Sequence, residues 1–252
     1  MTKVLITGAA GLIGTILRRE LADRYELRAL DRKRIPGSKS VAGDLAKGGR
    51  RIDRAFASCD AVVDLAGVPA LDTPWAVVRK NNIPATMNTL EAASRHGVAR
   101  VVYASSNHVT GLYEHDDPYA QIVAGDYGGL EPGAFRRITT ADPIRPDGSY
   151  ALGKAFGEAA ARYYAEEHGL SAICLRIGTC KASDRPERAR DFATLLTHGD
   201  LVRLVVAALE APDSVRFGTF YGVSANTWRF WELADARGAI GYEPVDDAER
   251  FR

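Results

Sequence analysis

The chain has 252 residues, of which 46% are hydrophobic and 26% are charged. This composition supplies one sizeable core, and the length is too short for two ordinary domains, so a single domain is expected. Its 33 lysines and arginines nearly balance 32 aspartates and glutamates. The net charge therefore gives no reason to expect a nucleic-acid or anionic-membrane partner.

The apolar segments are short throughout. Met1–Lys3 leads directly into Val4–Ile6, which is too brief for a signal peptide, and no later stretch approaches the roughly 18 apolar residues of a membrane span. The cysteines, Cys59, Cys174 and Cys180, are too few and too irregularly spaced for a disulfide framework or a zinc site. We therefore expect a soluble, cytoplasmic protein without a structural metal.

Short β-branched runs alternate with helical patterns along the chain. Strands are predicted at Lys3–Thr7, Glu26–Leu30, Ala61–Asp64, Arg100–Ala104, Ser171–Arg176 and Phe217–Tyr221. Helices are predicted at Leu12–Arg24, Trp75–His96, Tyr150–His168, Asp200–Glu210 and Thr227–Arg237. Pro84 is expected to kink or divide the second helix. Since parallel strands need crossover connections, the alternation predicts a doubly wound Rossmann-type α/β fold with a parallel sheet.

A long segment without helical or strand periodicity interrupts this pattern. From about Tyr113 to Pro146 the sequence is rich in glycine, proline, aspartate and aromatic residues. Connections of this length inside a compact domain are uncommon and are usually functional. Residues 109–145 are therefore predicted to be a lid or binding loop, with a surface insertion of no chemical role as the alternative.

A glycine-rich turn follows the first predicted strand. Gly8, Gly11 and Gly14, with Ala10, Leu12 and Ile13 between them, stand between this strand and a helix. Such a turn lets the backbone approach a pyrophosphate, and the helix N-terminus offers N–H groups to the anion. The alternative is an ordinary turn with close helix packing.

An acidic residue ends the second predicted strand. Asp31 is placed where a carboxylate would bind the ribose hydroxyls of NAD and repel the 2′-phosphate of NADP. Arg32 follows at once, with further basic residues behind it, so NADP stays an alternative. Asp31 as a simple turn residue is the other interpretation.

Tyr150 and Lys154 are four residues apart at the start of a predicted helix, so their side chains share one face. An ammonium group beside a phenol stabilises the phenolate and makes it a better base. Ser106 follows the fourth strand, at the sheet edge where ligands of open α/β folds bind. These residues predict an acid/base pair with a serine that binds the substrate oxygen.

Together with Asp44-Leu45, Leu65-Ala66-Gly67 and Asn82, these motifs resemble the extended short-chain dehydrogenase/reductase superfamily, which includes the NAD-dependent epimerases and dehydratases. The resemblance spans essentially the whole chain. It implies a catalytic Tyr150, Lys154 and Ser106, with Asp44 and Leu45 along the adenine of NAD. Further contacts to the cofactor are implied for Leu65, Ala66, Gly67, Asn82, Ala104, Ser105 and Ile177. About 1–170 would form the NAD-binding core and about 177–252 most of a small substrate-binding portion.

Other motifs are similar to those of the bacterial uronate dehydrogenases, which oxidise the anomeric carbon of a hexuronate to an aldarolactone. They are Ser105-Ser106-Asn107-His108, Arg145-Pro146-Asp147-Gly148, Phe156-Gly157-Glu158, Arg176-Ile177-Gly178 and Gly241-Tyr242-Glu243-Pro244. This resemblance implies sugar contacts from Ser106, Asn107, His108, Tyr150 and Thr179. It also implies that Arg190 clamps the substrate carboxylate bidentately.

The sequence departs from that group in two places. Pro69 stands where a substrate-contacting serine would align, and the connection from His108 to Arg145 is longer than expected. Arg185 and Arg188 are alternatives to Arg190. A sugar epimerase or dehydratase that retains its NAD is the main alternative function, and a non-catalytic dinucleotide sensor is a second. A homo-oligomer is expected from the superfamily.

Five further residues have local interpretations. His198 and Asp200 are predicted to cap the helix that follows them. Cys180 is expected to be a buried thiol rather than a nucleophile. Trp228 and Trp231 are expected in the core or at an interface.

Overall fold

The computed structural model describes residues 1–36 and 39–252. This part of the chain forms two compact units that interleave along the sequence. Unit 1 contains Met1–Ser105, Gly148–Cys174 and Asp213–Gly218. Unit 2 contains Ser106–Asp147, Leu175–Pro212 and Thr219–Arg252.

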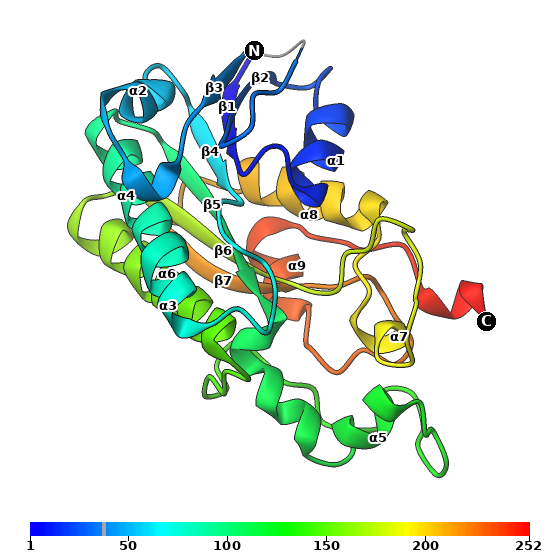
Figure 1. The fold of residues 1–252 in the computed structure, drawn as a ribbon. Helices are drawn as coiled ribbons and strands as arrows, with labels where there is room; N and C mark the ends of the chain where they lie inside the picture. The colour runs from blue at the N-terminus through cyan, green and yellow to red at the C-terminus, as the bar shows by residue number, and fades with distance from the viewer. Residues whose placement is uncertain (37–38) are drawn as a thin grey trace. The chain divides into compact units, whose positions relative to one another are not determined.

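The strands form a seven-stranded sheet in the order β3-β2-β1-β4-β5-β6-β7 (Figure 1). Neighbouring strands from β3 to β5 pair in parallel, which confirms the predicted Rossmann-type α/β fold. The strands are β1 Lys3–Thr7, β2 Glu26–Asp31, β3 Ser40–Ala42, β4 Ala61–Asp64, β5 Arg100–Ser106, β6 Ser171–Ile177 and β7 Phe217–Gly222. Among the strands of the described residues, only β3 was not predicted, because three residues are too few to show an alternating pattern.

Unit 1 holds the helical segments that follow its strands. They are α1 Leu12–Glu20, η1 Leu45–Lys47, α2 Arg50–Asp53, η2 Arg54–Phe56, α3 Trp75–Val77, η3 Val78–Asn82, α4 Ile83–Arg95 and α6 Ser149–Glu167. The segment η3 is a π-helix directly before α4, and Pro84 occupies the first turn of α4. Since proline has no N–H to continue the helical ladder, the predicted division at Pro84 is confirmed.

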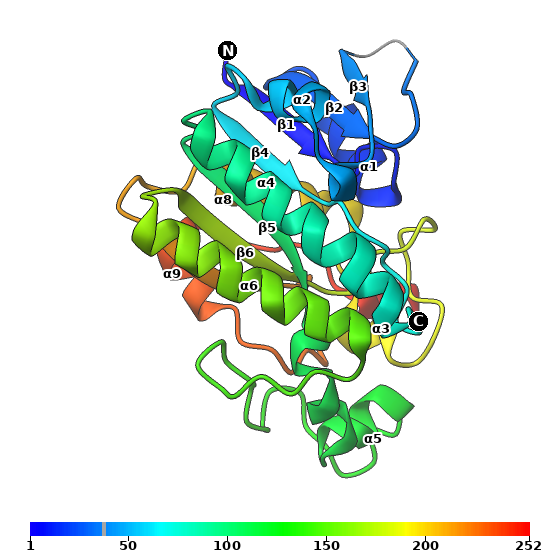
Figure 2. The same ribbon diagram turned by 60° about the vertical axis from the view of Figure 1, so that its left-hand side comes forward.

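Two long helices of unit 1, α4 and α6, lie side by side along one face of its strands (Figure 2). Strand residues such as Leu5 and Val62 are fully buried in the same core cluster as Leu90 of α4 and Ala161 of α6. Alanine and glycine positions on α6 let the helix approach the sheet closely. A Cβ atom at Gly157 would lie only 2.1 Å from the hydroxyl of Tyr103 on β5.

The helices of unit 2 are shorter than α4 and α6 of unit 1. They are η4 Asn107–His115, α5 Tyr119–Ala124, α7 Asp191–Thr194, α8 His198–Leu209, α9 Ala234–Ile240 and η5 Ala248–Phe251. The segment predicted to lack structure is therefore partly helical, and α5 packs against η4. Burial of Tyr119 and Ile122 stabilises this short helix, which its glycine- and proline-rich flanks obscured in the sequence.

The predicted helix Thr227–Arg237 is wrong over its first half, because α9 begins only at Ala234. The preceding residues form a turn at Thr227 and Trp228, and Trp231 then forms an isolated β-bridge with Ile138. Ile138 donates its N–H to the carbonyl of Phe230 and accepts from the N–H of Glu232. These bonds satisfy the backbone outside a helix and bury Trp231 completely. The prediction of core positions for Trp228 and Trp231 is confirmed.

The cap of α8 also differs from the prediction. Thr197, rather than His198 or Asp200, is the N-cap residue, and its hydroxyl accepts from the N–H of Asp200. Asp200 lies inside the first turn, where its fully buried carboxylate accepts from the N–H groups of Val245 and Asp246. The Asp200 side chain therefore links the C-terminal segment to α8 through these hydrogen bonds.

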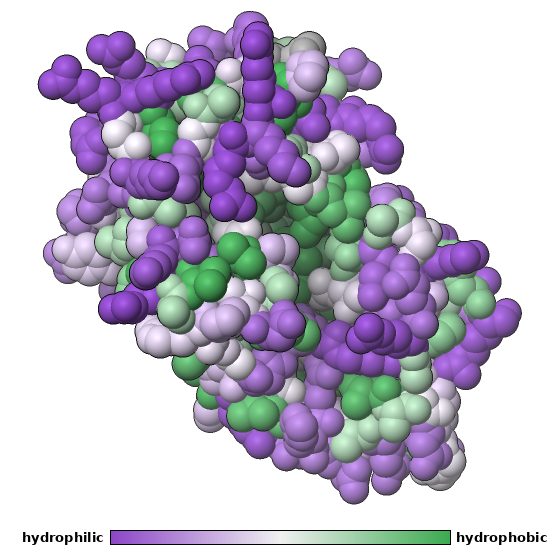
Figure 3. Space-filling model, in the orientation of Figure 1, coloured by the Kyte–Doolittle hydropathy of each residue, from purple (hydrophilic) through white to green (hydrophobic). Residues whose placement is uncertain are grey.

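Charged and polar side chains cover much of the face drawn in Figure 3, including the upper part, where Figure 1 places β1, β2 and α2. No helix within the described residues is long and apolar enough to cross a membrane.

Candidate functional site

The turn after β1 has the geometry of a dinucleotide site. Gly8 has a φ of +62°, and a Cβ atom there would lie 2.7 Å from the carbonyl oxygen of Leu65. A Cβ atom at Gly14 would lie 2.7 Å from the backbone of Gly8 and Ala9. Gly11 is the N-cap of α1 and has no side chain to occupy the free N–H groups. These N–H groups are available to a pyrophosphate, so the turn fits NAD.

Asp31 at the end of β2 is tied to the same turn. Its Oδ2 accepts from the N–H of Ala10 at 3.0 Å, and its Oδ1 accepts from the N–H of Lys33 at 2.9 Å. Each carboxylate oxygen can accept a second hydrogen bond, which leaves capacity for the ribose hydroxyls. Arg32 is exposed.

The segment after β4 is held by three side chains. Thr7 accepts from the N–H groups of Leu65 and Ala66, and its own hydroxyl donates to Asp64 at 2.5 Å. Asn82 closes the segment from the other side, since it accepts from the N–H of Val68 and donates to the carbonyl of the same residue. The predicted cofactor residues Leu65, Ala66, Gly67 and Asn82 therefore lie together. Asp44 caps η1, and Leu45 is buried beside it.

Tyr150 and Lys154 are both buried on α6. The lysine Nζ donates to the carbonyl of Ala104 at 2.5 Å and lies 5.8 Å from the centroid of the Tyr150 ring. Burial lowers the pKa of Lys154 to about 8, although the nearby carboxylate of Asp64 acts in the opposite direction. The hydrogen bond from Lys154 thus holds the predicted pair near the end of β5. The lowered pKa means that the charge of this lysine depends on its surroundings.

Tyr103 is a second tyrosine close to Lys154, with its ring centroid 4.9 Å from the Nζ atom. Burial raises the pKa of Tyr103 well above its ordinary value. This makes Tyr103 a poor base and leaves Tyr150 as the better partner for the lysine.

Ser105 and Glu158 join β5 to α6 inside unit 1, because the serine hydroxyl donates to the glutamate at 2.5 Å. Ser105 is thus a structural anchor at the position expected to contact the cofactor. Glu158 was not predicted as a site residue, although it lies one helical turn beyond Lys154 and so shares its face.

In unit 2, Ser106 and Asn107 begin the segment expected to bind the sugar. The Ser106 hydroxyl accepts from the N–H of His108 at 3.3 Å and lies 3.4 Å from the side-chain oxygen of Asn107. Asn107 is 2% exposed, yet its Nδ2 has no hydrogen-bond partner among the described residues. A buried donor without a partner is costly, and a substrate oxygen would satisfy it.

His108 is oriented by Asp147, whose carboxylate lies 2.5 Å from the ring Nδ1. Because a carboxylate accepts at Nδ1, the neutral ring presents Nε2 as an acceptor. A Cβ atom at Gly111 would lie 2.0 Å from the same carboxylate, so only glycine fits there. The conformation of His108 therefore depends on the Arg145-Pro146-Asp147-Gly148 motif.

Arg190 is brought together with Thr179, to whose hydroxyl its Nη1 donates at 2.9 Å. The Nε and Nη2 atoms donate to the two carboxylate oxygens of Glu114 at 2.6 and 2.7 Å. The bidentate face expected to clamp a substrate is therefore occupied by a side chain of the protein. No signal in the sequence singled out Glu114. Arg185 and Arg188 are both exposed.

The predicted residues divide between the two units. Unit 1 contains the glycine turn, Asp31, Asp44, Leu45, the Leu65–Gly67 segment, Asn82, Ala104, Ser105, Tyr150 and Lys154. Unit 2 contains Ser106, Asn107, His108, Ile177, Thr179 and Arg190. Burial raises the pKa of Cys180 to about 12, which supports the interpretation of a thiol that is not a nucleophile.

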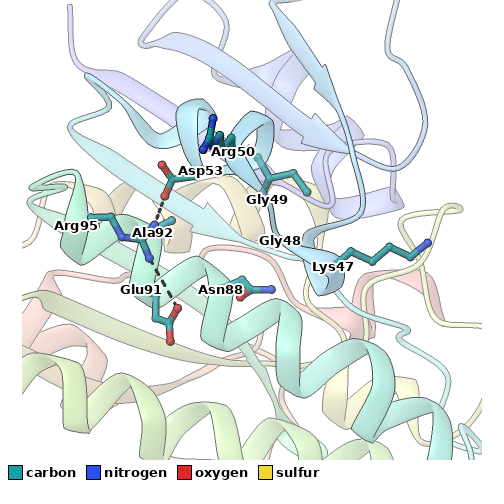
Figure 4. Close-up of a pocket in the computed structure, with 10 residues that line it drawn as sticks. Lys47, Gly48, Gly49, Arg50, Asp53, Asn88, Glu91, Ala92 and Arg95 are labelled. Carbon is teal, nitrogen blue, oxygen red and sulfur yellow. Dashed lines mark hydrogen bonds and ion pairs between the residues drawn. The ribbon is translucent and has the colours of Figure 1, made fainter.

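Unit 1 also has a hollow of about 400 Å³ that is separate from the predicted site residues (Figure 4). It is lined by residues of the η1–α2 segment and α4, and none of the predicted site residues is among the described residues that line it. Three of its charged side chains pair with one another, because Arg95 binds both Asp53 and Glu91. Hydrogen bonds from His96 and Arg95 to Asp53 lower the pKa of that carboxyl group. The two carboxylates among the described residues that line the hollow are therefore both paired with Arg95.

Comparison with known proteins agrees with this geometry. A uronate dehydrogenase from Agrobacterium fabrum is 34% identical over all of this chain and 88% of its own length. The L-arabinose 1-dehydrogenase (NAD(P)(+)) of Haloferax volcanii is 33% identical over 98% of both chains. A crystal structure of a mutant uronate dehydrogenase from Agrobacterium tumefaciens complexed with NAD is 32% identical. It has a TM-score of 0.82, over all of this chain and 88% of that one.

The model of the NAD-dependent epimerase/dehydratase family matches residues 4–198. The match includes the glycine turn, Asp31 and the Tyr150/Lys154 pair, and the prediction of NAD as cofactor is confirmed at the level of the family. The chain belongs to the NAD-dependent epimerase/dehydratase family.

Proposed function

We propose that this protein is an NAD-dependent dehydrogenase that oxidises the anomeric hydroxyl of a monosaccharide, a sugar or a sugar acid, to a lactone. The observation that carries the proposal is the buried Tyr150/Lys154 pair, whose lysine is held at the end of β5. Relatives named for uronate and for L-arabinose support the chemistry. Hexuronates, expected from the resemblance, are one candidate substrate class, and neutral aldoses are the other.

In the proposed reaction, Tyr150 as the phenolate accepts the proton of the substrate hydroxyl while a hydride leaves the same carbon. Bound NAD supplies the hydride acceptor. Lys154 stabilises the phenolate by its charge, and Ser106 donates a hydrogen bond to the substrate oxygen. Loss of one proton and one hydride raises the cyclic hemiacetal carbon to the carbonyl level of a lactone.

The substitution Tyr150→Phe tests this role. Turnover should fall by roughly two to three orders of magnitude, because the variant has no group to accept the proton. NAD affinity, measured by calorimetry, should stay nearly unchanged. Equal turnover in the variant would exclude Tyr150 as the base. Purified protein that retains bound NAD, and reduces no added NAD with any sugar or sugar acid, would favour the epimerase alternative.

We also propose that the protein is a cytoplasmic homo-oligomer. The support for an oligomer is the outer face of α6, where Leu152, Phe156 and Tyr163 are 52%, 39% and 54% exposed. Apolar side chains at this helical spacing form a surface suited to a second copy. Light scattering of the purified protein should give a multiple of the chain mass, and a monomeric mass would contradict the proposal. Cell fractionation tests the location.

A further inference from the structure

The pairing of Arg190 with Glu114 bears on the substrate class. A guanidinium has five N–H donors in a fixed planar arrangement. Two of those of Arg190 bind both oxygens of Glu114, and two on Nη1 bind the hydroxyls of Thr179 and Thr194 at 2.9 and 3.2 Å. Among these contacts with described residues, a single N–H on Nη2 is left over. One remaining donor cannot bind a substrate carboxylate bidentately.

The pair is also well shielded from water. The Glu114 side chain is 12% exposed and the Arg190 side chain is 23% exposed. A second carboxylate brought to Arg190 would lie next to that of Glu114, and like charges side by side in a partly buried place repel strongly. Removal of Glu114 from the arginine would instead leave its buried charge without a partner. Binding of a sugar acid is therefore unfavourable whether its carboxylate lies beside Glu114 or displaces Glu114 from Arg190.

The remaining hydrogen-bonding capacity suits hydroxyl groups. Each Glu114 oxygen can accept one more hydrogen bond, and the spare N–H of Arg190 can donate one. A sugar hydroxyl can donate to the carboxylate and accept from the guanidinium at once, whereas a carboxylate can only accept. Glu114 belongs to η4, the segment that begins at Asn107, so it follows the residues expected to contact the sugar.

We propose that Glu114 occupies the place of a substrate carboxylate, so that the enzyme oxidises neutral aldoses and discriminates against hexuronates. This inference rests on the proposed function and on the position that the resemblance to uronate dehydrogenases implies for Arg190, at the end of the sugar remote from the anomeric carbon. Glu114 then determines specificity in two ways: its charge repels a substrate carboxylate, and it occupies the N–H donors of Arg190 that such a carboxylate would need.

Matched sugars test the proposal. Glucose and glucuronate, and galactose and galacturonate, differ only in a hydroxymethyl group or a carboxylate at C6. With NAD, the wild-type kcat/KM should favour the neutral member of a pair by on the order of tenfold or more. In Glu114→Ala this ratio should fall at least roughly tenfold, mainly through a gain on the uronate, because Arg190 regains its free bidentate face.

Two controls separate the charge of Glu114 from general damage. Glu114→Gln keeps the shape and removes the charge, so its ratio should move in the same direction. Glu131→Ala removes an exposed carboxylate of the same connection and should leave the ratio unchanged. The double variant E114A/R190A should lose the gain on the uronate, because the gain requires the freed guanidinium.

The outcomes distinguish the two proposals. Wild-type preference for the uronate of a pair, or an unchanged ratio in both Glu114 variants, would overturn the role of Glu114 and leave the dehydrogenase proposal standing. Absence of NAD reduction with every sugar and sugar acid would overturn the proposed function, and this inference with it.

Discussion

Lys154→Met offers a test in which the size of the effect follows from the structure. Burial lowers the pKa of Lys154 in the folded protein to about 8, from an ordinary value of 10.5. Below pH 8 the lysine is charged in both states, and its burial costs the folded state about 3 kcal/mol, since one pKa unit corresponds to about 1.4 kcal/mol. Above pH 8 the folded state loses its proton first, so this cost shrinks as the pH rises towards 10.5.

The assay is urea denaturation of the nucleotide-free protein at pH 7 and pH 9.5, for the wild type and for Lys154→Met. Methionine carries no charge, so the wild type should gain about 2 kcal/mol of unfolding free energy relative to the variant between these two pH values. Other groups titrate equally in both proteins and cancel in the difference. A constant difference across this range, or one that changes in the opposite direction, would refute a burial-lowered pKa for Lys154.

Three further substitutions test other parts of the fold. Asp31→Asn should lower the affinity for NAD roughly tenfold. It should also reduce the preference for NAD over NADP, as measured by initial rates. An unchanged preference would exclude the proposed ribose contact. Asp200→Ala should lower the free energy of unfolding in urea by about 3 kcal/mol, whereas the exposed Asp23→Ala should change it little, and equal effects would contradict the fastening role of Asp200. Gly157→Ala should cost about 1–3 kcal/mol in thermal unfolding, because its Cβ meets Tyr103. Gly238→Ala has open space and should stabilise α9 by about 0.5–1 kcal/mol; the reverse order would be inconsistent with the packing.

Hydrophobic periodicity predicted some elements of this fold correctly and one helix wrongly. The apolar runs predict β1, β4 and β5 because strands buried on both faces show continuous apolar sequence. The helix predicted from Thr227 was wrong over its first half, where Phe230 and Glu232 bond to Ile138, a partner far away in the chain. An amphipathic pattern records which residues are buried, but it does not record whether backbone groups bond within the segment or to a distant one.

The sequence by itself determined the glycine turn, Asp31 and the Tyr150/Lys154 pair, because each depends on spacing within one strand, one turn or one helix. Only the tertiary structure showed that Glu114 occupies the bidentate face of Arg190, from 76 residues away. It also showed that Asp147 orients His108 and that Thr7 binds Asp64 across 57 residues. Side chains far apart in sequence meet only through the path of the whole chain, and local hydrophobic periodicity carries no record of that path.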